Sequence, residues 1–303
     1  TNVDAGTGTI TLLNPLNVFG QSLTPGSPST LSLIGTNTQV ATSSDLNLAR
    51  VDNSGTMTLS APNGSINLGL AFITGGDLTL VSKNDLLLGG AEIKGNLNLS
   101  STQGNVSFGE AKVLGDLIAT TNNKQVDLGS ANVGGNLNVS TNGGNIVQSP
   151  SNNATTCPAL CVSGLTNLNA GTGNVSLPNI PNQFTGPVSL QATNVELVGS
   201  NGLVLGSSTV SGTLNVTAAT GNITQTAPLN VSGLSTLTAV QGNVVLDAAN
   251  TFQSAVSLAT IKATIQTIKA NLGFDRLQQM RDASPTDRKS TRLNSSHGYI
   301  SYA

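Results

Sequence analysis

The sequence predicts an all-β protein, folded as a single-stranded parallel β-helix with coils of about 20 residues. Two observations carry this prediction. Glycines at one constant step, Gly75, Gly95, Gly115 and Gly135, open successive copies of one pattern. Inside each copy, apolar residues alternate with polar ones, as in the stretch that contains Leu97. A fixed period of this size indicates a solenoid, and alternation at every second residue indicates β-strands.

Apolar residues recur at matching positions of each copy, and we expect them to stack as ladders about 4.8 Å apart inside the coils. The two core ladders are Leu97, Leu117 and Leu137, and Val106, Val126 and Ile146. Further columns at the same step are Leu68, Leu88, Phe108 and Leu128; Gly69, Gly89, Gly109 and Gly129; Ala71, Ala91, Ala111 and Ala131; and Ile73, Ile93, Val113 and Val133. The glycines suit corners where a Cβ would clash or where φ is positive.

Each copy is expected to hold three strands of about three residues, because turns rich in Gly, Asn and Ser interrupt the alternation at short intervals. In the copy that starts at Gly95, the strands lie around Leu97, Val106 and Val113. The columns between the ladders are mostly Asn, Ser and Thr and should face outward. The regular core of the repeat covers residues 55–147, and residues 1–54 are a blurred version, with a loop around Pro25 and Pro28.

Composition bounds the function. Only 9% of the residues are charged and 3% are aromatic, yet no long apolar run of the kind that spans a membrane occurs, so no membrane span is expected. Residues 1–254 carry five basic and 11 acidic residues, whereas residues 255–303 carry seven basic and three acidic ones. The body has no basic stripe, so nucleic acid is not an expected partner. No signal peptide opens the chain, which suggests an interior piece of a longer protein.

A first irregularity lies at residues 148–163, an insertion loop in a β-helix domain that spans residues 1–254. The step from Gly144 to Gly173 exceeds the regular step by about nine residues. The loop contains Cys157 and Cys161, the two cysteines of the chain. Their spacing allows a small disulfide, which would fit an extracytoplasmic protein; free thiols and half of a metal site are the alternatives. A second expansion, of about eight residues, is expected near Ser200–Ser211, as a loop or part of an extra strand pair.

The C-terminal residues depart from the repeat. Within residues 255–287, Ile261, Ile265, Ile268 and Leu272 share one face of a predicted amphipathic helix, which would cap the open end of the β-helix. One further coil is the alternative, because the run is rich in Thr. Residues 288–303 resemble a translated cloning-vector or sequencing-adapter tail and are set aside as an artefact.

Charged residues show little that predicts chemistry. Glu92 is expected one coil below Lys112, as a surface ion pair, and Asp85 one coil below Asn105, as a turn contact. A catalytic carboxylate pair would need two acids on one face, and the pattern surrounds neither Glu92 nor Glu110 with apolar or titratable neighbours. We therefore predict no catalytic, cofactor-binding or metal-binding residues and no cofactor. The G-G-x-G-x-D nonapeptides of calcium-dependent solenoids are absent from the sequence.

The phrases GNLNLSSTQGNVSFGEAKVLGD, GNITQTAPLNVSGLSTLTAVQGNVVLDAANTF and GGNLNVSTNGGNIVQSP resemble the repeats of filamentous haemagglutinin-type exoproteins. These are bacterial adhesins of the two-partner secretion kind, and the resemblance covers about residues 1–258. It implies a right-handed β-helical shaft, export through an outer-membrane transporter, and a secreted or cell-surface location. The expected function is the shaft of an adhesin that binds cells or surfaces, with an unknown receptor. The alternative, by fold analogy, is a β-helix polysaccharide lyase or hydrolase.

Overall fold

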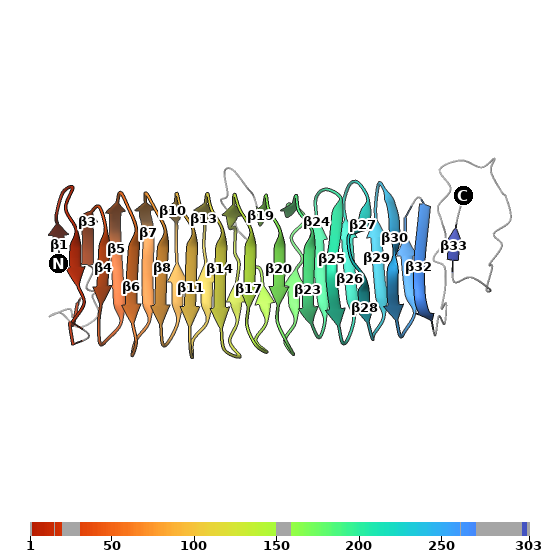
Figure 1. Ribbon diagram of the computed structural model, residues 1–303, viewed down its shortest axis with the longest axis horizontal. Coiled ribbons are helices and arrows are strands. Elements are labelled where there is room, and N and C mark those ends of the chain that lie inside the picture. The colour runs from red at the N-terminus through yellow and green to blue at the C-terminus, as the bar shows by residue number, and fades with distance from the viewer. Residues whose placement is uncertain are drawn as a thin grey trace.

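The chain folds into an elongated rod of stacked β-strands (Figure 1). The computed structural model describes residues 2–14, 16–19, 31–149, 159–260, 262–270 and 299–301. Among these residues all regular structure is β, and the parallel strands form a solenoid of about 11 turns. The predicted fold class, a parallel β-helix with coils of about 20 residues, is therefore confirmed.

The strands belong to two sheets that run along the rod. The 15-stranded sheet contains β2 (Ile10–Leu12), β4 (Thr38–Ala41), β6 (Met57–Ala61), β8 (Leu78–Ser82), β11 (Leu97–Ser101), β14 (Leu117–Thr121), β17 (Leu137–Ser140), β20 (Thr166–Asn169), β23 (Val188–Ala192), β25 (Leu203–Val210), β27 (Ile223–Gln225), β28 (Leu229–Val231), β30 (Asn243–Phe252), β32 (Lys262–Ala270) and β33 (Tyr299–Ser301). The 18-stranded sheet contains β1 (Asn2–Asp4), β3 (Leu31–Gly35), β5 (Leu46–Asn53), β7 (Ile66–Thr74), β9 (Leu86–Leu88), β10 (Ala91–Ile93), β12 (Val106–Phe108), β13 (Ala111–Val113), β15 (Val126–Asp127), β16 (Asn132–Val133), β18 (Ile146–Val147), β19 (Cys161–Val162), β21 (Val175–Leu177), β22 (Gln183–Phe184), β24 (Val195–Gly199), β26 (Leu214–Ala218), β29 (Ser235–Ala239) and β31 (Val256–Ala259).

Each central coil contributes three short strands, as the spacing predicts. The coil with β11, β12 and β13 is followed by one with β14, β15 and β16, and each strand pairs in parallel with its counterpart. Two of the three strand stacks form one sheet because β5 and β7 are long enough to pass through the corner between them. The coils in the middle of the rod are therefore three-sided, although hydrogen bonds join two of the three sides into one sheet.

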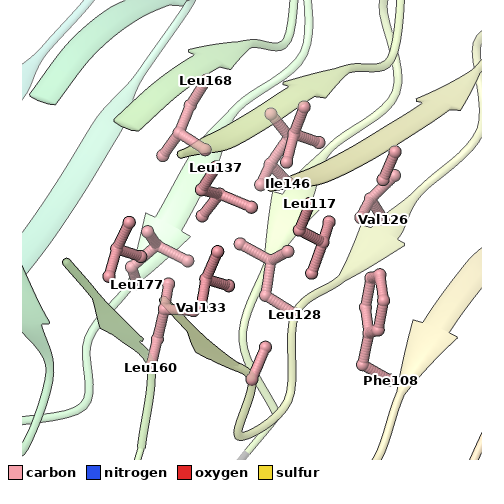
Figure 2. Packing of buried hydrophobic residues seen from close by; sticks show 14 of the residues in the cluster. Phe108, Leu117, Val126, Leu128, Val133, Leu137, Ile146, Leu160, Leu168 and Leu177 are labelled. Atoms are coloured by element: carbon pink, nitrogen blue, oxygen red, sulfur yellow. The ribbon is translucent and has the colours of Figure 1, made fainter. Parts of the chain in front are cut away.

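The core is the column of inward side chains that the alternation of the strands produces. In β11, Leu97 and Leu99 are buried while the residues that alternate with them are partly exposed. Leu97 pairs with Leu117 and Leu117 with Leu137, and the ladder of Val106, Val126 and Ile146 pairs in the same way. Figure 2 shows Leu117, Leu137, Val126 and Ile146 of these ladders, which converge from several strands into one apolar interior. Stacking of like residues keeps the interior close-packed from coil to coil.

The expansion expected near Ser200–Ser211 is wrong. Residues 203–210 form β25. The Thr213 N–H donates to Asn194 Oδ1 in the preceding coil, 19 residues before it, so this coil has close to the regular length. The error has an identifiable origin, since the phrase Gly-Asn-Val or Gly-Asn-Ile leads into β12 and β21 in the 18-stranded sheet but into β27 and β30 in the 15-stranded sheet. The phrase therefore lies on one side of the coil at β12 and β21 and on another side at β27 and β30. Matching its copies across this change overestimates the number of residues in one coil.

The helix predicted within residues 255–287 is also wrong where the structure describes that segment. Val256–Ala259 is β31, which stacks on β29, and Lys262–Ala270 is β32, which stacks on β30. Without a following coil, the backbone edge of β30 would be left with unpaired hydrogen-bonding groups. Segments rich in Thr and Ile also fit a pleated surface, so a further coil is more favourable here than a helix. Residues 271–287 lie outside the described part of the chain, and β33 pairs antiparallel with β32.

Candidate functional site

The groups that carry hydrogen-bonding chemistry line the corners of the coil. At the corner before the 15-stranded sheet, an Asn or Asp side chain of one coil accepts a hydrogen bond from the backbone of the next coil. Asp77 Oδ1 accepts from the Asn96 N–H at 2.7 Å, Asn96 Oδ1 from the Asp116 N–H at 2.9 Å, and Asp116 Oδ1 from the Asn136 N–H at 2.7 Å. Asn136 continues the series by accepting from the Leu165 N–H at 2.8 Å.

This ladder explains three of the glycines that open the copies, Gly95, Gly115 and Gly135. A Cβ built on Gly95 would overlap Asp77 Oδ1, and a Cβ on Gly115 would overlap Asn96 Oδ1. The same relation holds between Gly135 and the Oδ1 of Asp116. Each side chain of the ladder therefore occupies the space that only a glycine leaves free in the coil above, and the dipeptide Gly-Asn or Gly-Asp is one structural unit.

A second corner of the coil, before β12 and its counterparts in the 18-stranded sheet, has the same kind of hydrogen bond between coils. Asp85 Oδ1 accepts from the Asn105 N–H at 2.8 Å, which is the turn contact predicted for this pair. Asn105 Oδ1 accepts from the Gln125 N–H at 3.0 Å, and beyond the insertion Asn174 Oδ1 accepts from the Asn194 N–H at 3.1 Å. These carboxylates and amides are used in holding coils together.

The predicted ion pair is present. Lys112 Nζ lies 3.2 Å from Glu92 Oε1, with side chains that are 49% and 42% exposed. Glu92 thus faces the lysine of the next coil. No group of three or more His, Cys, Asp and Glu side chains that could hold a metal ion occurs in the part of the chain that the structure describes.

The insertion lies between β18 and β19. On the other side of it, the Asn174 N–H donates to Asn145 Oδ1 in the preceding coil, and these two residues are 29 residues apart, which confirms the longer step that the sequence predicts. Cys161 is disulfide-bonded and sits at the start of β19, where the chain rejoins the wall of the rod. Cys157 lies outside the described residues, so its pairing with Cys161 stays a prediction.

Two amide pairs that the sequence pattern did not predict join neighbouring coils; Gln148, Asn182 and Asn250 are buried, and Gln225 is half-buried. Gln148 Nε2 donates to Asn182 Oδ1 at 2.7 Å, and Asn182 Nδ2 donates back to Gln148 Oε1 at 2.9 Å. Gln225 and Asn250 repeat this arrangement, at 3.0 Å in both directions. Each pair joins consecutive coils inside the rod, where an amide left without partners would be costly.

A sequence signal for these pairs exists. Each glutamine ends a phrase Gly-Asn-Ile-x-Gln, at Gln148 and Gln225, and each asparagine begins a phrase Asn-x-Phe, at Asn182 and Asn250. The separations are 34 and 25 residues. The excess in the first pair matches the insertion that lies between Gln148 and Asn182. Both pairs therefore join consecutive coils, the first beside the 18-stranded sheet and the second beside the 15-stranded sheet.

Comparison with known proteins supports the repeat. A family model described as Repeats of unknown function (DUF5649) matches residues 75–117, 114–191 and 192–259. Neither the curated proteins nor the solved structures give a match to the chain. Among the described residues, none forms a helix of the length and apolarity that crossing a membrane requires.

Proposed function

Because the chain belongs to the DUF5649 family of repeats, whose description assigns no activity, we propose from the structure that it is the structural shaft of a secreted or cell-surface bacterial adhesin. The observation that carries the proposal is the unbroken succession of coils, in which each coil pairs with the one before and the one after it. Hydroxyl and amide groups predominate on the outward side of the 15-stranded sheet, which suits attachment by many weak contacts.

A rod of this construction suits a spacer. About 11 coils at about 4.8 Å each span roughly 50 Å. Since each coil contacts only its neighbours, stability is close to a sum of coil and interface terms, and length changes by whole coils without a new core. Such a shaft holds whatever lies at its end at a defined distance from a surface.

The adhesin part of the proposal rests on the resemblance of the repeat phrases to filamentous haemagglutinin-type exoproteins. On that basis the partners are an outer-membrane two-partner secretion transporter and a receptor on a cell or surface. The disulfide at Cys161 supports a location outside the cytoplasm, because disulfides persist mainly in oxidising compartments. Exposed columns of Asn, Thr and Ser would supply the binding surface.

The spacer role is tested by displaying the chain on a bacterial surface with an epitope tag at its distal end. Antibody access to the tag is expected to fall stepwise as whole coils are deleted. Equal access at every length would contradict the spacer role.

Adhesion is tested with beads that carry the chain, applied to cultured cells and to abiotic surfaces. The expected result is retention above that of beads coated with an unrelated protein of equal charge. Absence of retention on every surface would remove the adhesive part. The enzyme alternative is tested on a glycan panel, where release of reducing sugar or unsaturated product would replace the proposal.

A further inference from the structure

The outer side of the 15-stranded sheet lacks charge over most of its length. We call the outward-facing side chains of β4, β6, β8, β11, β14, β17, β20, β23, β25 and β28 the neutral face. These ten strands contain no Asp, Glu, Lys, Arg or His. In contrast, the strands of the 18-stranded sheet contain seven charged residues: Asp4, Arg50, Asp52, Glu92, Lys112, Asp127 and Glu196. Charge is thus kept off most of one side of the rod.

The neutral face is a regular surface of self-complementary groups. Its strands lie side by side along the rod in Figure 1, and each pairs in parallel with the next. Its outward residues are mostly Thr, Ser and Asn, such as Thr79, Asn98 and Asn138. Hydroxyl and primary amide groups both donate and accept hydrogen bonds, so each can pair with its own kind.

Two exposed apolar side chains interrupt the polar columns. Ile118, on β14, is 40% exposed between Asn98 and Asn138, and Val81, on β8, is 38% exposed. Both lie on the neutral face, and Ile118 is in its fifth strand of ten. Apolar anchors near the centre of a polar patch are the arrangement of a protein interface, whose charged residues gather at the rim. Lys83 and Asp85 follow β8 in the turn at the edge of this face.

We propose that the neutral face pairs with the neutral face of a second copy of this chain, so that two rods associate side by side. A second copy presents the same groups at the same spacing, and therefore keeps register along the whole length. A charged partner would find no counter-charge on the face. This inference goes beyond the shaft role and does not depend on adhesion.

The size of the face agrees with a dimer. Strands of five residues, such as β8 and β11, span about 17 Å, and ten strands span about 48 Å along the rod. Their product is roughly 800 Å² on each copy, the area that each partner contributes to a standard specific interface. Because the face is largely polar, we expect a reversible dimer and not an obligate one.

The test compares two substitutions that are alike except for the side on which they lie. Ile118→Lys puts a charge in the neutral face, and Leu87→Lys puts one on β9, where Leu87 is 45% exposed on the other sheet. Sedimentation equilibrium over a concentration series gives the dimer dissociation constant for the wild type and both variants. Circular dichroism and melting show that each variant keeps the fold.

The expected result is a wild-type dimer, a dissociation constant raised by at least about tenfold in Ile118→Lys, equivalent to about 1.4 kcal/mol, and no change in Leu87→Lys. Small-angle scattering should show that the dimer is wider than the monomer but no longer. A chain that stays monomeric at every concentration would overturn the proposal. So would a dimer of doubled length, or one that Ile118→Lys and Leu87→Lys weaken equally.

Discussion

At the scale of single residues, the fold depends on a glycine and an Asn or Asp side chain that share one space. Asn96 Oδ1 sits below Gly115 and accepts the N–H of the next residue, Asp116. The glycine is required by this neighbour and by the backbone of Gly95, and not by its own φ angle. The requirement is therefore steric and comes from the neighbouring coil, far away in the sequence.

Gly115→Ala is expected to destabilise the protein by about 1–3 kcal/mol, the usual cost of forcing extra atoms into a filled site. Urea unfolding at fixed temperature measures the change. Because part of the cost is overlap with Asn96 Oδ1, Asn96→Ala should reduce it, and the double mutant should be more stable than the sum of the single effects predicts. Strict additivity would show that the two residues do not share this space.

The Glu92–Lys112 pair belongs to the same scale and should matter little. Both side chains are more than 40% exposed, so solvent and salt weaken their attraction. Glu92→Gln is expected to change the free energy of unfolding by no more than about 1 kcal/mol, with a smaller effect in high salt. Thermal melts at two salt concentrations measure this. A larger loss would mean that Glu92 has a second role.

At the scale of the strand, β9 shows how alternation divides a uniform sequence. Its three residues are all leucine, yet Leu86 and Leu88 are buried and Leu87 is 45% exposed. Composition cannot distinguish them, and only the pleat decides which side chain faces the interior.

Leu88→Ala is therefore expected to cost about 2–5 kcal/mol, because it leaves a cavity in a close-packed column. Leu87→Ala, the same chemical change one residue earlier in the same strand, should cost no more than about 0.5 kcal/mol. Urea unfolding of both variants gives the comparison. Equal losses would contradict the inward and outward assignment of β9.

The buried pair of Gln148 and Asn182 acts between elements. Asn182 accepts from Gln148 and from the Leu160 N–H at 3.0 Å, so Asn182→Ala leaves buried donors without an acceptor. The expected loss is at least about 2 kcal/mol, from the cost of unsatisfied buried polar groups. Asn167→Ala, at an exposed position of β20, is the matched control and should be nearly neutral. Thermal melts distinguish the two, and a neutral Asn182→Ala would contradict this role.

At the scale of the whole molecule, the constant register from coil to coil makes the coil an interchangeable unit. Deletion of residues 95–114 joins Lys94 to Gly115, which places each following strand on its counterpart one coil earlier. The shortened chain is expected to fold and to form a rod about 5 Å shorter. Small-angle scattering measures the length, and circular dichroism measures the β content.

Deletion of residues 95–104, half of this segment, is the control. It would place strands of one side of the coil over another side and interrupt the glycine and Asn/Asp ladders, so we expect loss of cooperative melting. A half-coil deletion that folds as well as the full one would contradict the fixed register of the solenoid.

Residue patterns alone predicted the β-helix, the period, the three strands of each central coil, the inward ladders, the longer step at the insertion, and the Glu92–Lys112 and Asp85–Asn105 contacts. These follow from local alternation and from a repeat that places each residue over its counterpart. Where the period is regular, the residue one period further along the sequence is also the spatial neighbour in the next coil.

The remaining features depend on how the coils stack in three dimensions. It placed residues 203–210 in β25, made Lys262–Ala270 a strand instead of a helix, and paired Gln148 with Asn182 across the insertion. It also showed that charge is absent from most of one side of the rod. The physical reason is the same in each case: the position of a residue on the coil depends on all the turns before it. A phrase such as Gly-Asn-Ile can therefore occupy different sides of the coil, and the partner that satisfies it is fixed only when the coils stack.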